Sequence, residues 1–445
     1  MLVALLVAWV VPPADAAAAE PPPGPAPLEI TAGRQDDPVR LRLGASVWLR
    51  GEVRSSPPAE ARWVVPQRTR LQADLRWRGL RTFVQLQDVR GWGTAPSLTS
   101  TPATTGLHQG YLELTGKRGA SEGMIRVGRQ EYFQGSMRLI GNAPWNPHMR
   151  SFDALRLRGA QGPFSIDLVG ALSRTPERFT VTDEAGNERT IDSKAEGVLM
   201  GSFGVAAHES AQLEAYVIAR NLEPTAAEPD RERMVLSPGA RLTGKPWRGL
   251  SYDLEGYVQT GRWDGRGHGA LLGSATVGYR FGGRGRPLVE GGYVVATGSG
   301  CETVGERVVC DRDLHRDVDP LFGARHRFLG ILDLFAATNV QDGWLGARVE
   351  PLPWLELRTE LHHFMLYDPT GRWLATNDEI VGRGPDPDNR QRTVGEELDL
   401  RASLHPWGPL TLQLGYAVFV PTGAGGRMIG ESPYQLGYLL TQLAF

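Results

Sequence analysis

Segments in which apolar and polar residues alternate recur along the chain, and they constrain its fold more than any other feature. In one of them, two sets of residues alternate: Leu398, Leu400, Ala402 and Leu404 with Glu397, Asp399, Arg401 and Ser403. Successive side chains of a β-strand point to opposite faces, so this alternation predicts a strand with one apolar face and one charged face. Its repetition predicts an all-β chain.

Eighteen segments carry the pattern. We expect strands near residues 38–54, 67–78, 80–91, 107–115, 123–131, 150–159, 163–174, 196–207, 210–221, 233–243, 249–261, 268–282, 286–298, 339–350, 353–366, 394–405, 409–420 and 433–445. A soluble sandwich is not expected to carry charges of both signs on one face of so many strands. An even number of strands places both ends of the chain on one side, as single-chain outer-membrane barrels require.

The connections between the expected strands alternate between short and long. The short ones contain mostly Gly or Pro and are 78–80, 160–162, 208–210, 283–285, 351–352 and 406–408. The long ones are 91–106, 132–148, 173–195, 299–339 and 367–392. Outer-membrane barrels have short periplasmic turns and long extracellular loops, whereas loops of this length are uncommon in compact soluble domains. The sequence therefore predicts a transmembrane antiparallel β-barrel of about 18 strands.

The two ends of the chain agree with this fold. The last expected strand ends on Phe445, which is typical of the closing strand of an outer-membrane barrel. Residues 2–11 are almost wholly apolar and precede two prolines and several alanines, so we expect a signal peptide over 1–19, although its first residues include no Lys or Arg. We expect a disordered, proline-rich lead-in over 20–37 and the barrel over 38–445.

Basic charge is concentrated early in the chain, although the net charge of the whole is only −2. Between residues 40 and 158 there are 18 Arg and one Lys against eight acidic residues. The chain has three Lys and 45 Arg, a bias that reflects genome composition, so no single Arg is informative by its type alone. The sequence carries no nucleic-acid-binding motif.

Two cysteines, Cys301 and Cys310, lie nine residues apart in a polar, glycine-flanked segment. In an exported chain this spacing favours a disulfide that closes a loop, and two free thiols are the alternative. Two cysteines and scattered histidines do not define a metal site, and we expect no cofactor. The same connection, 299–339, is dense in charge near 311–319 and is a candidate lid over the barrel.

A barrel of this size can hold an aqueous lumen, so its inward side chains determine what passes. By alternation the inward charges are Arg70, Arg76, Arg81, Arg126, Arg156, Arg158, Arg358, Arg401, Asp74, Glu356, Glu360, Glu397 and Asp399. The planar guanidinium of Arg holds carboxylates bidentately, so these positions could attract anionic solutes, while the acids between them would keep each contact weak. The alternative is that these charges only pair with each other along a solvated inner wall.

Six strings of residues resemble the alginate-export family of outer-membrane barrels. They are Phe83–Gly93, Arg126–Gln130, Arg138–Asn142, Ser151–Leu157, Arg325–Gly330 and Val394–Leu400. The resemblance covers about residues 67–445 and is weakest from 174 to 299. It implies a monomeric, 18-stranded barrel with an electropositive constriction, through which a uronate-rich polysaccharide leaves the periplasm, delivered there by an export scaffold.

The resemblance also implies that certain arginines contact the polyanion: Arg129, Arg358, Arg401, Arg90 and Arg156. By strict alternation Arg129 shares a face with Val127, and Arg90 shares one with Leu86, so these two reach the lumen only if their strands carry bulges. The inward acids Glu356, Glu360 and Glu397 depart from the family pattern. They leave open whether the solute is alginate.

Two other functions remain open on the sequence. A general porin, or an uptake channel for acidic oligosaccharides, would have the same fold. An outer-membrane hydrolase would need a constellation drawn from His362, His363, Asp368 and Ser432, but no Gly-x-Ser-x-Gly string accompanies them. Adjacent histidines on a strand also point to opposite faces, so at most one of this pair reaches the lumen. We therefore expect a pore and no enzyme.

Overall fold

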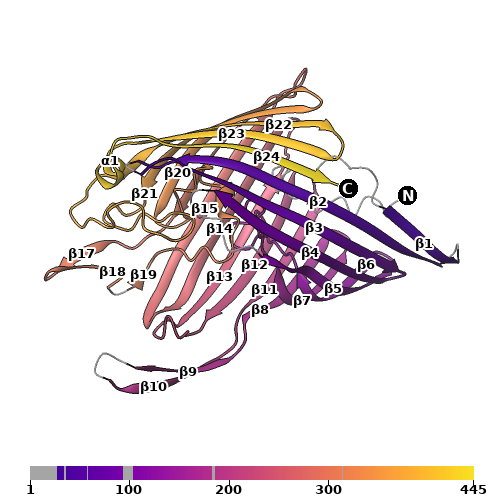
Figure 1. Ribbon diagram of the computed structural model, residues 1–445, viewed down its shortest axis with the longest axis horizontal. Coiled ribbons are helices and arrows are strands. Elements are labelled where there is room, and N and C mark those ends of the chain that lie inside the picture. Colours follow the sequence, from indigo (N-terminus) through magenta and orange to yellow (C-terminus); the bar gives the residue numbers. More distant parts are fainter. Residues whose placement is uncertain (1–27, 35–36, 58, 94–103, 183–185, 313) are drawn as a thin grey trace.

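Eighteen antiparallel strands close into a barrel (Figure 1). The computed structural model describes residues 28–34, 37–57, 59–93, 104–182, 186–312 and 314–445. The signal peptide expected over 1–19 lies outside the described residues, as does the lead-in as far as residue 27. The barrel strands are β2 (Asp37–Ser55), β3 (Arg62–Trp77), β4 (Leu80–Gly93), β5 (Thr104–Arg118), β6 (Ser121–Gln130), β7 (Phe152–Gln161), β8 (Phe164–Arg174), β11 (Glu196–His208), β12 (Ala211–Leu222), β13 (Arg233–Gly244), β14 (Leu250–Trp263), β15 (Arg266–Arg280), β16 (Leu288–Ala296), β20 (Val340–Leu352), β21 (Leu355–Leu366), β22 (Thr393–Trp407), β23 (Leu410–Pro421) and β24 (Tyr434–Ala444).

The expected strands and their facing are confirmed. Outward apolar side chains such as Leu71 and Leu361 are 59% and 51% exposed, whereas inward Arg50 and Glu360 are buried. This reverses the pattern of a soluble protein and produces an apolar outer wall for contact with lipid. The barrel closes where β2 pairs with β24, from Ser46 opposite Ala444 to Ser55 opposite Gln435.

Residues 28–34, expected to be part of a disordered lead-in, instead form strand β1 (Leu28–Arg34). β1 pairs antiparallel with the first residues of β2, from Leu28 opposite Leu43 to Arg34 opposite Asp37. β3 pairs along one edge of β2. Along the other edge, β24 pairs with β2 as far as Phe445, and β1 pairs with the remaining residues of β2. Backbone hydrogen bonds between β1 and β2 order this short segment.

Small elements lie at the end of the barrel that carries the long loops, opposite the end from which β1 projects (Figure 1). They are the hairpins β9 (Glu177–Thr182) with β10 (Glu188–Ser193) and β17 (Cys301–Val304) with β18 (Arg307–Cys310), strand β19 (Leu314–His315) and helix α1 (Ala424–Ile429). The 3-10 helix η1 (Arg325–Arg327) lies on the connection between β19 and β20. One connection at this end is tight: only Asp264 and Gly265 separate β14 from β15. No helix among the described residues is long and apolar enough to cross a membrane.

Two of the long loops fold back into the barrel, and the main buried cluster lies inside it. The loops are 131–151, between β6 and β7, and 320–339, between β19 and β20. They pair with each other through a parallel bridge between Ile140 and Phe322 and a 2.9 Å bond from Ala324 N to Met137 O. Apolar side chains from the loops pack against the inner wall: Leu139, Leu329, Leu332 and Phe335 against Ile218, Phe364 and Phe419.

Candidate functional site in the barrel lumen

Charged groups of the barrel wall hold loop 320–339 inside the lumen. The backbone N–H of Leu332 donates to Glu397 Oε1 at 2.9 Å, and that of Ile331 donates to Asp399 Oδ2 at 3.2 Å. Arg54 of β2, three strands along the wall from β22, donates to the carbonyl of Leu332. These bonds fix the innermost turn of the loop, so the lumen is narrowed at a defined position.

The loop 131–151 is anchored by a buried arginine of β2. Arg50 Nη1 donates to the carbonyl of Trp145 at 2.7 Å, and its guanidinium carbon lies 3.5 Å from the centre of the Trp145 ring. The other face of Trp145 stacks on His326 at 3.8 Å, so this contact also joins the two loops. Since Arg50 is fully buried and paired with Glu52, the anchor is shielded from solvent.

A row of arginines crosses the inner wall on six neighbouring strands, β2 to β7. Residues directly opposite each other in the strand register are, in order, Arg40, Arg76, Arg81, Glu113, Arg126 and Arg156. The row starts beside the tight turn at Arg78 and Gly79, which is the periplasmic end of the barrel. Because barrel strands are tilted, a row perpendicular to them rises around the wall toward the constriction.

The arginines of this row outnumber the acids beside them. Asp74 accepts hydrogen bonds from both Arg76, at 2.8 Å, and Arg81, at 2.9 Å. Arg126 donates to Glu113 at 2.7 Å, and Arg156 donates to the carboxylate of Asp167 at 2.9 Å. One carboxylate therefore serves two guanidiniums at the start of the row, which leaves excess positive charge on this part of the wall near the periplasmic mouth.

Another part of the wall, β20 to β22, carries a shorter arginine row beside a row of acids. Arg348, Arg358 and Arg401 lie opposite one another on β20, β21 and β22. One step nearer the loop end, Glu360 lies opposite Asp399. Arg358 lies 2.9 Å from Glu360 and 3.3 Å from Glu290, and Arg401 also bonds Glu360. This side of the lumen is close to neutral.

A cavity of about 100 Å³ lies where the two inward loops meet this wall. Its charged lining comprises Arg138, Arg327, Arg358, Arg401, Asp253, Glu255, Glu290, Glu360 and Asp399. Arg138 is stacked over the ring of Phe328 at 4.0 Å and lies 4.0 Å from Glu255. Donors and acceptors thus both line a space that could hold one small polar unit of a solute.

Two of the arginines expected in the lumen lie outside it. The register of β6 has no shift between Arg126 and Gln130, so Arg129 faces outward with Val127 and pairs with Asp153. The pairing of β3 with β4 is likewise regular, and Arg90 faces outward beside Asp88. The bulges that a lumen position required are absent from these pairings, and the expectation for these two residues was wrong.

The remaining expected residues do face inward, in several settings. Arg76, Arg126 and Arg156 belong to the longer row, and Arg358, Arg401 and Glu360 belong to the shorter one. Arg70 is largely enclosed, donating to Gln87 at 2.8 Å and lying 3.4 Å from Glu131, while Glu356 lies 3.7 Å from Arg348. Glu397 and Asp399 are 0% and 1% exposed beneath loop 320–339. Both carboxylates anchor the loop, and Asp399 also contributes to the lining of the cavity.

The residues weighed for a hydrolase are not brought together. His362 faces inward and bonds Asp342 at 2.9 Å, whereas His363 faces outward and bonds Glu396 at 3.1 Å. Asp368 accepts from the backbone and hydroxyl of Thr370 in the outer loop, and Ser432 is exposed. Their contacts among the described residues go to other partners, and no nucleophile–base pair forms from them.

Alternation along strands could not reveal the loop residues of the cavity. Arg138, Arg327 and Phe328 come from connections, whose entry into the lumen leaves no periodic pattern in the sequence. The signal that existed was the pair of strings at 138–142 and 325–330, which resemble the alginate-export family and here form the constriction.

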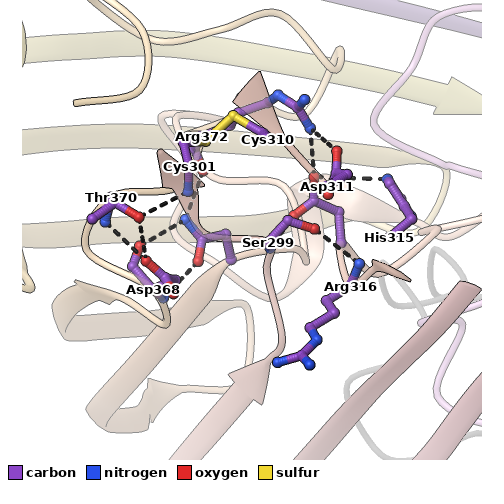
Figure 2. Close-up of a disulfide and its surroundings, with 11 residues drawn as sticks. Ser299, Cys301, Cys310, Asp311, His315, Arg316, Asp368, Thr370 and Arg372 are labelled. Carbon is purple, nitrogen blue, oxygen red and sulfur yellow. Dashed lines mark hydrogen bonds and ion pairs between the residues drawn. A yellow bond between two sulfur atoms is a disulfide. The ribbon is translucent and has the colours of Figure 1, made fainter. Parts of the chain in front are cut away.

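A second charged cluster lies outside the membrane-spanning strands, beside the disulfide that joins Cys301 and Cys310 (Figure 2). Arg372 Nη1 lies 2.9 Å from both Asp311 and Asp317. Burial lowers the pKa of the neighbouring His315 to about 4, so its imidazole is neutral at pH 7. Burial and the adjacent Asp311 raise the pKa of the Asp317 carboxyl to about 6.

The closed barrel, its apolar outer wall and its charged lumen define a channel of the bacterial outer membrane. A family model described as alginate export matches residues 39–431. The chain belongs to the alginate-export family. A comparison with curated proteins finds no match.

Solved structures of outer-membrane channels from Pseudomonas aeruginosa share the fold. OccK5 (OpdH) is 11% identical, with a TM-score of 0.58 over 93% of this chain and 99% of that chain. The outer membrane protein OpdK is 10% identical, with a TM-score of 0.57 over 91% and 98%. OprD is 10% identical, with a TM-score of 0.52 over 91% and 95%. At these identities the likeness concerns the fold alone.

Proposed function

We propose that the protein is a passive pore through which an anionic, uronate-containing polysaccharide leaves the periplasm. The observation that carries the proposal is the row Arg40, Arg76, Arg81, Arg126 and Arg156, which rises from the periplasmic mouth. Fixed positive charge at a mouth raises the local concentration of anions and excludes cations. Family membership supports a polymer as the solute.

The acids in the lumen suit a solute that must keep moving. A uronate carboxylate that displaced Glu113 from Arg126 would exchange one charge-assisted bond for another of similar strength, so each step would be nearly neutral in free energy. The sugar hydroxyls could bond the mixed donors and acceptors of the cavity. Transport would be driven from elsewhere, with a periplasmic export scaffold delivering the polymer to the turn end of the barrel, and no chemistry would take place on the chain.

The first test is selectivity in planar bilayers. The wild-type protein in a salt gradient should show an anion-selective reversal potential, and uronate oligomers should block its current. Arg126→Gln should reduce both the selectivity and the block. Arg129→Gln is the matched control, because Arg129 is on the same strand but faces outward, and it should change neither. Cation selectivity without block by uronate oligomers would refute the proposal.

Uptake of acidic oligosaccharides is the second candidate, and the small cavity between the loops favours it. A space of about 100 Å³ fits a single sugar-sized unit better than a moving polymer. The length of the longest oligomer that passes through the pore separates the two functions. If oligomers longer than the barrel wall still pass from the turn side to the loop side, export is supported. If only mono- and disaccharides pass, the protein is an uptake channel.

A further inference from the structure

Three side chains that can ligate a metal converge just after the disulfide-closed hairpin β17–β18 (Figure 2). Asp311, His315 and Asp317 are 5%, 4% and 6% exposed, and each offers one ligand atom within 4.8 Å of the others. They lie on the connection between β16 and β20, at the loop end of the barrel. Neither the lumen nor its proposed solute uses them.

The imidazole of His315 is held with one nitrogen directed at the cluster. β19 pairs in parallel with Gly267 and His268 of β15, and His315 Nδ1 lies 3.0 Å from His268 Nδ1. The ring also stacks on Trp263 at 4.0 Å with an interplanar angle of 8°. His315 Nε2 then lies 3.8 Å from Asp317 Oδ2, which is too long for a hydrogen bond. Histidines that bind metals are oriented in this way, through a bond at the other ring nitrogen.

The two carboxylates carry bonding capacity that the protein does not fill. Asp317 Oδ1 accepts the backbone N–H of Ser299 at 2.7 Å, which directs Oδ2 toward the cluster. Asp311 Oδ1 is buried and has no hydrogen-bond partner among the described residues. A buried, unfilled carboxylate oxygen is costly, so the arrangement favours a further cationic partner.

Arg372 marks the position of that partner. Its Nη1 lies 2.9 Å from Asp311 Oδ2 and 2.9 Å from Asp317 Oδ2, so a single positive nitrogen occupies the point between the two carboxylates. One guanidinium opposes two carboxylates, which leaves the cluster with net negative charge. Arg372 belongs to the other outer loop, 367–392, so its side chain is not part of the segment that carries the three ligands.

We propose that Asp311, His315 and Asp317 form a binding site for a divalent transition-metal ion such as Zn²⁺, which takes the place of the Arg372 guanidinium. One imidazole and two carboxylates are a donor set that suits Zn²⁺, whose bonds to nitrogen and oxygen are about 2.0–2.2 Å long. Contraction of the present spacing to those lengths needs loop shifts on the order of 1 Å. Ca²⁺, which prefers six or more oxygen ligands, suits the site poorly.

Metal binding would change how the two outer loops are joined. With Arg372 displaced, the ties that remain between the loops include a 2.9 Å bond from Cys301 N to Thr370 Oγ1 and a 3.2 Å bond from Asn339 Nδ2 to Asp368 O. The connection that holds the metal ligands continues directly into the inward loop 320–339. Occupancy of the metal site would therefore change the position of the first residues of loop 320–339, which forms part of the constriction.

The test is equilibrium dialysis of the purified full-length protein in detergent against Zn²⁺, with metal analysis. One tightly bound Zn²⁺ per chain is expected, and Ca²⁺ at the same concentration should not compete. Arg372→Met should tighten Zn²⁺ binding about tenfold, because the competing cation is removed. His315→Ala should weaken it by at least about tenfold. His363→Ala, an exposed histidine on the outer wall, is the matched control and should have no effect.

The opposite outcomes are equally clear. If neither the wild-type protein nor the Arg372→Met variant binds Zn²⁺, the cluster is only an ion-pair network and the proposal is wrong. If Zn²⁺ binds with unchanged affinity in His315→Ala, the metal is elsewhere and the proposal is also wrong. Asp311→Asn is the second ligand variant, to be used if His315→Ala does not fold as judged by heat-modifiable mobility in gels. These binding measurements do not depend on which solute crosses the pore.

Discussion

Arg358 of β21 and Arg401 of β22 lie directly opposite each other on the inner wall of the barrel, and one carboxylate, that of Glu360, bonds both. Two guanidiniums on facing positions repel each other unless an acid lies between them. Glu360 therefore permits the arginine row and at the same time hides part of its charge from the lumen.

Replacement of Glu360 by Gln should expose that charge. We expect the reversal potential in a salt gradient to move further toward the anion limit, because two arginines lose their shared counter-charge. The barrel should lose about 1–3 kcal/mol of stability, since an amide oxygen replaces only part of the carboxylate's bonding. Glu356→Gln is the control, because that carboxylate lies 3.7 Å from Arg348 and is not the one that bonds both Arg358 and Arg401. Equal shifts of the reversal potential in both variants would show that the shared bonding of Glu360 to two arginines does not determine the selectivity.

Gly330 should control the width of the constriction. It has a φ of +73°, and a Cβ there would lie 2.4 Å from the carboxylate of Glu397. Gly330→Ala should push loop 320–339 off its anchor and raise single-channel conductance. Gly305→Ala is the matched control, because Gly305 also has a positive φ, +62°, but no atom lies within 4 Å of its Cβ position. Unchanged conductance in Gly330→Ala would mean that the loop does not limit the current.

Arg50 should be the most sensitive single anchor of the first inward loop. Arg50→Ala removes the bond to Trp145 and leaves the buried Glu52 with only Arg54, at 3.6 Å, as a cationic partner, which should cost about 3 kcal/mol. Unfolding in guanidinium, followed by tryptophan fluorescence, measures the loss. Arg42→Ala, which breaks a solvent-exposed pair with Glu29, should cost no more than about 1 kcal/mol. A similar small loss in Arg50→Ala would contradict the anchor.

Reduction of the disulfide should affect the outer loop and leave the barrel intact. β17 and β18 form a separate two-stranded sheet, and Cys301 lies opposite Cys310 at its base. Treatment with a reductant should increase proteolysis near residues 302–309 while the thermal unfolding temperature of the barrel stays constant. A parallel fall in the unfolding temperature would show that the hairpin supports the wall.

Most of the barrel could be predicted from the sequence because the alternation of facing along a strand depends only on neighbouring residues. Leu398 and Asp399 face opposite sides whatever the rest of the chain does, and the register only adds which neighbour lies beside each. The same rule correctly placed Arg129 and Arg90 outside the lumen, and the family resemblance was wrong to move them in. Here local geometry was the better guide.

The constriction could not be predicted in the same way. Arg138 and Phe328 meet only because two long connections pair with each other inside the barrel, a contact across almost two hundred residues of chain. Nothing periodic marks such a contact in either segment. The strand β1 escaped prediction for a related reason, because its order depends on pairing with the part of the β2 edge that β24 does not cover.

The end-to-end arrangement of β24 and β1 along β2 has a consequence for assembly. One strand, β2, receives the last segment of the chain along Ser46–Ser55 and its own hairpin partner along Asp37–Leu43. One edge of β2 is therefore covered in two parts, by β1 and by β24, which meet at Phe445. When β24 pairs with β2 to close the barrel, β1 already covers the first part of that edge. We expect this short hairpin to act as a register stop, which prevents β24 from sliding past Ala45 when the wall is sealed.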